Sequence, residues 1–353
     1  MTARERFLAC LRMATAQQPE GRDGTHRVRR VAVGNAVSIA TVHLMEATGC
    51  WFPDAHLEPD VMAGLAAAGH ELLGYDTIAP VFSVQHEAAA LGCQVDWGRR
   101  DLMPDVVGRR YTQAEEIQVP ADFLQHPACV VVLEALSRLR RRYPDVALIG
   151  KVFGPWTLAY HLFGVEPFLI MTLDDPPQVH EVLRRLTHVP VVFAQAQLEA
   201  GADAVTLGDH ATGDLVSGRM YRGFLWPVHR ELARQIPGPV ILHICGDTAD
   251  RIADIAHTGF ACFHFDSKVP ARRAREIVDE QSSGVAGGRR IALMGNINNP
   301  TTLLHGTPED VAQEVQECLR CQVEVIGPEC AVPLTAPTEN LRAITEAVEA
   351  ATA

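Results

Sequence analysis

The stretch PVILHICGD, residues 239–247, combines a buried-strand pattern with two side chains that can bind a metal. Its run at 240–244 is almost entirely apolar, which is typical of a strand covered on both faces in a parallel sheet. His243 and Cys245 are two residues apart, so they point to the same side of such a strand. Gly246 then lets the backbone turn sharply. The stretch therefore predicts a strand that ends at a polar site.

Further segments of this kind alternate with helical sequence along the chain. Such alternation predicts βα units and a parallel sheet. The predicted strands are residues 31–36, 77–84, 146–153, 203–208, 240–244, 260–266, 291–295 and 323–327. Eight strands suit a (β/α)8 TIM barrel, whose functional residues gather at the C-terminal ends of the strands. A doubly wound open sheet is the alternative, but no glycine-rich phosphate loop follows the first strand.

The 353 residues are predicted to form a single TIM-barrel domain, 1–353, with an N-terminal helical lead at 1–30. The long gap between Val84 and Val146 is rich in charges and is predicted to be an insertion or lid between strands two and three. Residues 284–290, GVAGGRR, are typical of a mobile connector. Thr307 and Pro308 predict the start of a helix, because they supply an N-cap and a proline at the first helical position.

Composition limits the class of protein. The chain is 47% hydrophobic and 21% charged, which is ordinary for a soluble protein with a large core. No apolar run approaches the roughly 20 residues that span a bilayer, and the charged N-terminus does not resemble a signal peptide. We therefore expect a cytoplasmic protein. A net charge of −12 disfavours a nucleic-acid surface. Nine cysteines in such a protein are typical of free thiols, metal ligands or catalytic groups.

A distant cysteine extends the candidate metal site. Cys330 follows another predicted strand, in GPECAVPLTAPTENL at 327–341. The C-terminal ends of strands in one barrel lie side by side, so Cys330 can converge with His243 and Cys245. One imidazole and two thiolates are a good ligand set for zinc, and three protein ligands leave one position for substrate. The sequence therefore predicts a catalytic zinc ion.

Three more residues are candidates for this site. Asp266 closes the predicted strand 260–266, where its carboxylate could fill the fourth zinc position at rest and give way to a substrate thiol. Alternatively, Asp266 caps the following turn. His210 and Asp209 follow the strand at 203–208 and are predicted to contact substrate or to support the site. We therefore predict Asp266, Asp209 and His210 as catalytic residues.

The other cysteines and histidines are predicted to have structural roles or to be solvated. Cys318 and Cys321 form a C-x-x-C motif, but it lies inside a predicted helix without a second pair, which favours two ordinary helix residues. The remaining cysteines are predicted to pack in the core: Cys10, Cys50, Cys93, Cys129 and Cys262. Three further histidines near predicted strand ends or loops are predicted to be structural or solvated: His56, His86 and His264.

Several stretches along most of the chain carry a family resemblance. They are LMEATGCWFPDAH (44–56), EAAALGCQV (87–95), GPWTLA (154–159), AGADAVTLGD (200–209), ILHICGD (241–247), MGNINNPTTLLHGTPEDV (294–311) and PECAVPLTAPTENLRAI (328–344). Together they resemble the uroporphyrinogen decarboxylase superfamily and, within it, the zinc-dependent methylcobamide:thiol methyltransferases.

The resemblance implies a TIM barrel that binds zinc through His243, Cys245 and Cys330, with Asp266 at the position of an acidic fourth ligand of the resting enzyme. It implies transfer of a methyl group from methylcobalamin or another methylated corrinoid to a thiol such as coenzyme M. The corrinoid is normally carried by a small separate protein. No segment of this chain resembles a corrinoid-binding D-x-H-x-x-G motif, so we expect that partner in trans.

Three alternatives remain open. The methyl acceptor could be tetrahydrofolate, or the barrel could be a non-catalytic zinc-binding or corrinoid-binding protein. The third alternative, a uroporphyrinogen decarboxylase-like lyase, is disfavoured. Decarboxylases of this superfamily bind the propionates of their substrate through an arginine-rich N-terminal motif, and residues 31–49 contain no arginine.

Overall fold

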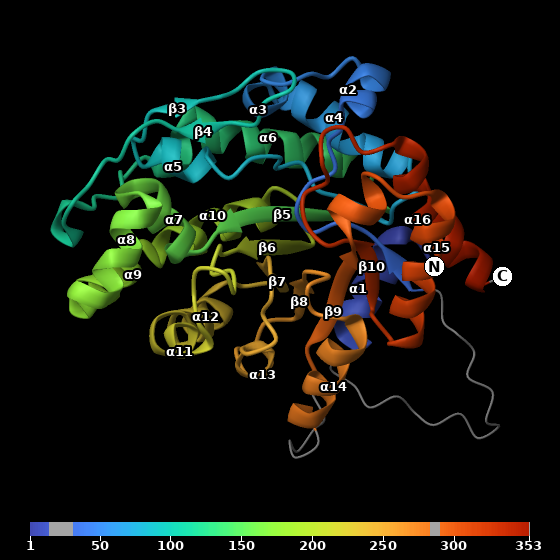
Figure 1. The fold of residues 1–353 in the computed structure, drawn as a ribbon. Helices are drawn as coiled ribbons and strands as arrows, with labels where there is room; N and C mark the ends of the chain where they lie inside the picture. Colours follow the sequence, from blue (N-terminus) through green and yellow to red (C-terminus); the bar gives the residue numbers. More distant parts are fainter. Residues whose placement is uncertain (14–30, 283–289, 353) are drawn as a thin grey trace.

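A computed structural model describes residues 1–13, 31–282 and 290–352 of the protein (Figure 1). The predicted connector at 284–290, apart from Arg290, and residues 14–30 of the predicted lead lie outside the described residues. Within the described ranges, no helix is long and apolar enough to cross a membrane.

Eight parallel strands form the centre of the molecule, in the order β1-β10-β9-β8-β7-β6-β5-β2. They are β1 (Ala32–Val33), β2 (Thr77–Ile78), β5 (Ala147–Phe153), β6 (Ala204–Gly208), β7 (Val240–Ile244), β8 (Cys262–Phe265), β9 (Ala292–Ile297) and β10 (Val325–Pro328). Asp76 joins the two ends of this sheet, because its N–H donates to Val33 O at 2.8 Å and its carboxylate accepts from Val33 N at 2.9 Å. The predicted TIM barrel is confirmed.

The first two strands are much shorter than predicted. The segment after β1 leaves the sheet and crosses the C-terminal end of the barrel. There Ala36 O accepts from Thr206 Oγ1 at 2.6 Å, and Val37 O accepts from Lys151 Nζ at 3.0 Å. These carbonyls therefore bond to side chains from inside the barrel and not to a neighbouring strand. The Gly34 N–H still donates to Ile326 O of β10 at 3.0 Å, and strand pairing ends after this bond for that reason.

Helices surround the barrel (Figure 1). The helices that alternate with the strands or follow the last one are α4 (Pro59–Glu71), α6 (Pro127–Arg142), α10 (His188–Glu199), α12 (Trp226–Gln235), α13 (Ile252–Ile255), α14 (Ala271–Ser282), α15 (Pro308–Arg320) and α16 (Thr338–Thr352). α15 begins as predicted, with Thr307 and Asp310 forming a capping box. The helix α1 (Ala3–Met13) packs against β1, β2, β5 and β9, and its Phe7 is buried among the apolar residues of the barrel interior.

Shorter elements elaborate the loops at the C-terminal ends of the strands. After β1 come α2 (Val42–Thr48) and α3 (Asp54–Leu57). Between β2 and α6 lie α5 (His86–Ala90), the antiparallel pair β3 (Val95–Asp96) and β4 (Asp105–Val106), and the turns η1 (Ala114–Glu116) and η2 (Phe123–Gln125). This is the segment predicted as an insertion. After β5 come α7 (Pro155–Phe163), α8 (Val165–Asp174) and α9 (Pro176–Leu186), and after β6 and β9 come α11 (Gly218–Met220), η3 (Tyr221–Leu225) and η4 (Asn299–Leu303).

Candidate metal centre

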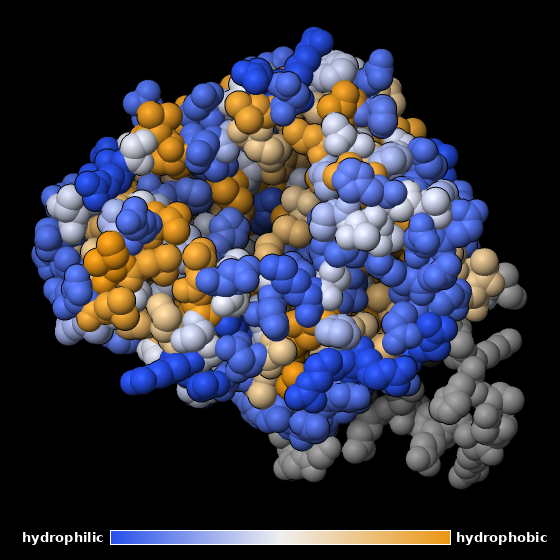
Figure 2. All heavy atoms as spheres, in the orientation of Figure 1, coloured by the Kyte–Doolittle hydropathy of each residue, from blue (hydrophilic) through white to orange (hydrophobic). Residues whose placement is uncertain are grey.

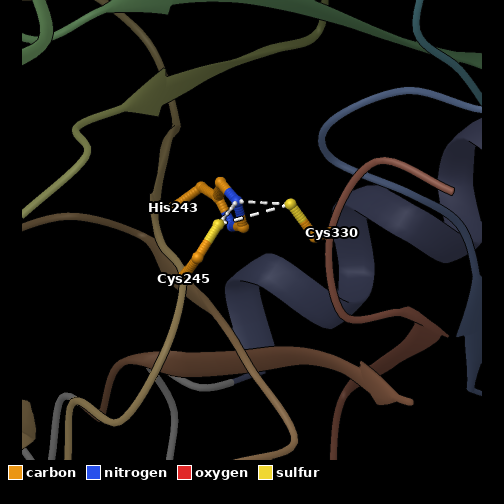
Figure 3. Close-up of side chains that lie close together, drawn as sticks. All are labelled: His243, Cys245 and Cys330. Atoms are coloured by element: carbon orange, nitrogen blue, oxygen red, sulfur yellow. Dashed lines mark hydrogen bonds between the residues drawn. The ribbon is translucent and has the colours of Figure 1, made fainter. Parts of the chain in front are cut away.

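Three side chains converge at the C-terminal end of the barrel (Figure 3). Cys245 Sγ lies 3.1 Å from His243 Nε2 and 3.3 Å from Cys330 Sγ, and Cys330 Sγ lies 3.4 Å from His243 Nε2. Among the residues that the structure describes, they are the group of histidine, cysteine and acidic side chains whose ligand atoms come close enough to hold one metal ion. The structure therefore brings together the three ligands predicted from the sequence.

The backbone holds the two halves of this group in place. His243 belongs to β7, where it is in register with Gly208 of β6 and His264 of β8. Cys330 lies in the loop after β10, and this loop is tied to its surroundings on both sides. Asn35 Nδ2 donates to Cys330 O at 2.9 Å, and Asn299 Nδ2 donates to Ala331 O at 2.7 Å.

The donor set suits zinc. Bonds of about 2.3 Å to sulfur and about 2.0 Å to nitrogen, at tetrahedral angles, put ligand atoms roughly 3.5–3.8 Å apart. The three observed distances are shorter than that spacing by roughly 0.1–0.5 Å, which small side-chain rotations can supply. Two thiolates would also neutralise the charge of a divalent ion. The residues therefore fit a zinc ion with one coordination position left for another ligand.

His264 sets the proton position on His243. His264 Nε2 donates to Pro328 O at 2.8 Å, and burial lowers the pKa of His264 well below its ordinary value, so the ring is neutral. Its Nδ1 is then an acceptor, 2.8 Å from His243 Nδ1. His243 donates from Nδ1, which faces this acceptor and, at 3.3 Å, the backbone carbonyl oxygen of His264, and this leaves the Nε2 lone pair facing the two cysteines. A second ring that fixes the tautomer of a ligand histidine is typical of metal sites.

The thiols of Cys330 and Cys245 differ in acidity. The hydrogen bond between them lowers the pKa of Cys330 well below its ordinary value and raises that of Cys245. This geometry stabilises one thiolate beside one thiol. Only one proton therefore has to leave before both sulfurs can act as anionic ligands.

Asp266 lies directly after β8, beside the metal group. Its Oδ2 accepts from the Gly246 N–H at 2.8 Å, and its Oδ1 accepts from the Lys268 N–H at 2.9 Å. These are the contacts of a turn cap, and they hold the loop that follows Cys245. Its carboxylate is outside the convergent group of three. A role as fourth ligand requires Asp266 to release at least one of these N–H groups, and it stays a prediction.

Asp209 is buried in a network of its own. Its Oδ1 accepts from the Thr157 N–H at 2.8 Å and from Thr157 Oγ1 at 3.2 Å, while its Oδ2 lies 3.0 Å from His229 Nε2. His229 in turn contacts Tyr221 Oη at 3.0 Å. Asp209 therefore holds the start of α7 in place. Among the described residues, the Asp209 carboxylate has no hydrogen bond to the three candidate metal ligands.

His210, the next residue, lies near the metal group. Its ring lies beside Phe153, with 6.2 Å between the ring centroids. Burial lowers the pKa of His210, and the nearby His243 lowers it further, whereas Asp209 and Cys330 raise it. His210 is thus within electrostatic reach of two of the three metal-binding residues, as a substrate contact would be. Its catalytic role remains a prediction.

Sequence reasoning missed two buried ionisable residues close to this group. Lys151 of β5 is 2% exposed, and Glu87 of α5 is fully buried. Cys330 and Glu87 are the charged groups that act on Lys151, so the lysine lies close to the metal group. A lysine inside the otherwise apolar strand ALIGKVF is the signal that could have revealed it, because such strands rarely contain a charge.

The other cysteines and histidines lie apart from the site. All nine cysteines are free thiols, and Cys318 and Cys321 are buried in and just after α15. Cys318 packs in the core, where burial raises its pKa to about 12. His86 bonds to Ser83 Oγ and His56 O, and the His56 ring stacks on Phe52 with 4.2 Å between the centroids.

Comparison with known proteins adds independent evidence. The family model described as uroporphyrinogen decarboxylase (URO-D) matches residues 9–351. The methylated-thiol–coenzyme M methyltransferase of Methanosarcina mazei is 34% identical over 323 residues, which cover 91% of this chain and 85% of that protein. A methylcobamide:CoM methyltransferase of Methanosarcina barkeri is 31% identical over 91% of this chain and 93% of its own. The solved structure of a methyltransferase from Methanosarcina mazei matches with a TM-score of 0.90 at 30% identity, over all of both chains.

Proposed function

The chain belongs to the uroporphyrinogen decarboxylase family, and from that premise we propose that it is a zinc-dependent methyltransferase that moves a methyl group from a methylated corrinoid to a thiol such as coenzyme M. The convergence of His243, Cys245 and Cys330 carries the proposal, because it provides three zinc ligands and an open position. The relatives named as methyltransferases of coenzyme M, which align over most of the chain, support the same activity.

Each residue has a task in this reaction. His243, Cys245 and Cys330 would hold the ion, and His264 keeps the Nε2 lone pair of His243 available for it. A bound zinc ion would supply the positive charge that deprotonates a substrate thiol near neutral pH, where a free thiol is mostly protonated. In the overall reaction the cobalt–carbon bond breaks and a carbon–sulfur bond forms. The products are a methyl thioether, a Co(I) corrinoid and the proton of the thiol.

We propose that the corrinoid arrives on a small separate protein. Three apolar side chains of α8 are exposed, Val165, Ile170 and Leu173, the last to 79%. α8 follows α7 at the C-terminal end of β5, so it borders the end of the barrel where the metal group lies. Figure 2, which has the orientation of Figure 1, shows apolar surface in the region of α8 at the left and a hollow near the centre of the same face. Exposed apolar surface of this kind is typical of protein–protein contact sites.

We also propose a cytoplasmic location for the protein, because its cysteines are all free thiols.

The metal content of the purified protein tests the proposal first. We expect close to one zinc ion per chain in the wild type and loss of the ion in Cys330→Ser. Cys318→Ser is the matched control, because that thiol is buried away from the site and should not affect zinc content. Turnover of methylcobalamin with coenzyme M should be lost together with the zinc. Full activity in a zinc-free Cys330→Ser variant would refute the mechanism.

A further inference from the structure

A buried carboxylate stands next to the candidate metal ligand Cys330 in the chain. Glu329 is 5% exposed, and no lysine, arginine or histidine among the described residues forms an ion pair with it. Its Oε2 accepts from the Ser267 N–H at 2.8 Å, and its Oε1 accepts from the Asn299 N–H at 2.8 Å. Burial of a carboxylate is costly, and charged hydrogen bonds to backbone N–H groups offset that cost. The buried position of Glu329 therefore depends on both donors.

The two donors belong to different loops at the C-terminal end of the barrel. Ser267 follows β8 and Asn299 begins η4 after β9, whereas Glu329 follows β10. The loop after β10 has a further bond to η4, because Asn299 Nδ2 donates to Ala331 O at 2.7 Å. Both neighbours of Cys330 in the sequence are thus bonded to adjacent loops. The main chain of this ligand is therefore held from two sides.

The loop after β8 extends this connection to the other cysteine. Asp266 immediately precedes Ser267, and its Oδ2 accepts from the Gly246 N–H at 2.8 Å. Gly246 directly follows Cys245. Two carboxylates in series therefore join the loop that carries Cys330 to the loop that carries Cys245. The sulfur atoms at the two ends of this connection are 3.3 Å apart.

We infer that Glu329 is a positioning residue of the metal site, whose carboxylate fixes the loop after β10 against the loop after β8 and so sets the spacing of Cys245 and Cys330. The inference rests on the proposed function and adds to it a residue that acts on the ligands without being one of them. Ligands that are held at the required spacing lose less conformational freedom when an ion binds, so the affinity for the ion is higher.

Zinc affinity separates this role from a general contribution to the fold. Glu329→Gln keeps the size of the side chain but turns an amide NH2 group towards one of the two N–H donors. Competition with a zinc chelator should show binding weaker than in the wild type by on the order of 10–100-fold, the usual effect of losing a residue that orients metal ligands. Loss of stability alone does not change the zinc affinity of molecules that remain folded.

The same strand supplies a matched control. Glu324 lies at the other end of β10, away from the metal group, and its Oε2 accepts from the Leu293 N–H at 2.8 Å. It also pairs with Arg275 and Arg290. Glu324→Gln and Glu329→Gln should both unfold at a lower urea concentration than the wild type when zinc is absent. Glu324→Gln should keep the zinc affinity of the wild type.

Glu329→Asp distinguishes the reach of the side chain from its charge. This variant keeps the carboxylate but is shorter by one methylene group, so it cannot span the two donors. We expect weaker zinc binding here as well. The variant also serves if glutamine impairs folding, which urea denaturation will show.

The outcomes separate the inference from the proposed function. Wild-type zinc affinity in Glu329→Gln, together with lower stability, would give Glu329 a purely structural role and overturn the inference. Wild-type affinity in Glu329→Asp beside a loss in Glu329→Gln would mean that the charge acts and not the spacing, and would overturn it as well. Failure of the zinc-loaded wild type to methylate any thiol would instead refute the proposed function, which the affinity measurements do not test.

Discussion

His243 and His264 meet through their Nδ1 atoms, 2.8 Å apart, on neighbouring strands of the barrel. Because Pro328 O fixes the proton of His264 on Nε2, the acceptor in this pair is His264 and the donor is His243. The nitrogen of His243 that faces the cysteines is thereby kept unprotonated. The candidate metal site thus depends on a residue that is not one of its three predicted ligands.

Replacing His264 with Phe should weaken zinc binding by on the order of 10–100-fold, because His243 Nδ1 loses its partner at 2.8 Å and keeps the backbone carbonyl of residue 264 at 3.3 Å. Competition with a zinc chelator measures this affinity. His56→Phe is a matched control, since His56 is also buried but its ring nitrogens have no hydrogen-bond partner among the described residues. An affinity unchanged in His264→Phe would show that the pair does not position His243.

Asp266 is predicted to occupy the fourth metal position of the resting enzyme. If so, Asp266→Ala should change the visible absorption spectrum of the Co²⁺-loaded protein before thiol is added, and the spectra should coincide once thiol is bound. Asp214→Ala, which removes an exposed carboxylate nearby, should leave both spectra as in the wild type. Identical resting spectra of Asp266→Ala and wild type would reduce Asp266 to its observed role as a turn cap.

Asp209 should matter more for stability than for chemistry. Asp209→Asn removes the charge that accepts from Thr157 and faces His229, so the free energy of unfolding should fall by about 3 kcal/mol. Urea denaturation measures the change. His210→Ala should cost less stability, because its ring makes no hydrogen bond within the described residues, and should instead lower kcat/KM. A stable but inactive Asp209→Asn would contradict this assignment and favour a catalytic Asp209.

Glu87 should make the protein less stable as pH rises. Its pKa is about 7 in the folded protein and 4.5 when unperturbed, so between these values the folded state holds a proton that the unfolded state has lost. The stability that Glu87 contributes is full below pH 4.5 and decreases by about 3 kcal/mol as pH rises through 7.

Glu87→Gln should remove this contribution and make the slope of stability against pH more positive between pH 5 and 7, because His56 and His86, whose pKa values burial lowers, contribute in the opposite direction. Denaturation with urea across that range gives the profile. Glu134→Gln, a change on the exposed face of α6, should keep the slope of the wild type. Equal slopes in Glu87→Gln and wild type would mean that Glu87 is ionised throughout.

The sequence predicted the barrel well where strands are buried on both faces. The strand 240–244 was predicted with its observed bounds, because a short and almost entirely apolar run bounded by turn residues is typical of a buried strand. β1 and β2 were predicted too long. Nothing local in 34–37 reveals that the carbonyls of Ala36 and Val37 bond to Thr206 and Lys151, which are more than a hundred residues away.

The site residues also divide into those that the sequence pattern predicts and those that depend on distant contacts. His243 and Cys245 could be placed on one side of a strand by their spacing, and Cys330 by the shared end of a barrel. The role of His264 could not be predicted, because it depends on the register between β7 and β8 and on the carbonyl of Pro328. Such contacts follow from tertiary packing and leave no pattern within either strand.

The join between β1 and β2 is the weakest part of the barrel wall, since each strand has two residues and Asp76 supplies the bonds that connect them. The segment that leaves β1 is also the one whose Asn35 anchors Cys330. A zinc ion bound by Cys330 would therefore also hold this segment, so closing of the wall and binding of the ion would favour each other by the same free energy. The zinc content proposed for this protein would then report how completely its barrel wall is closed.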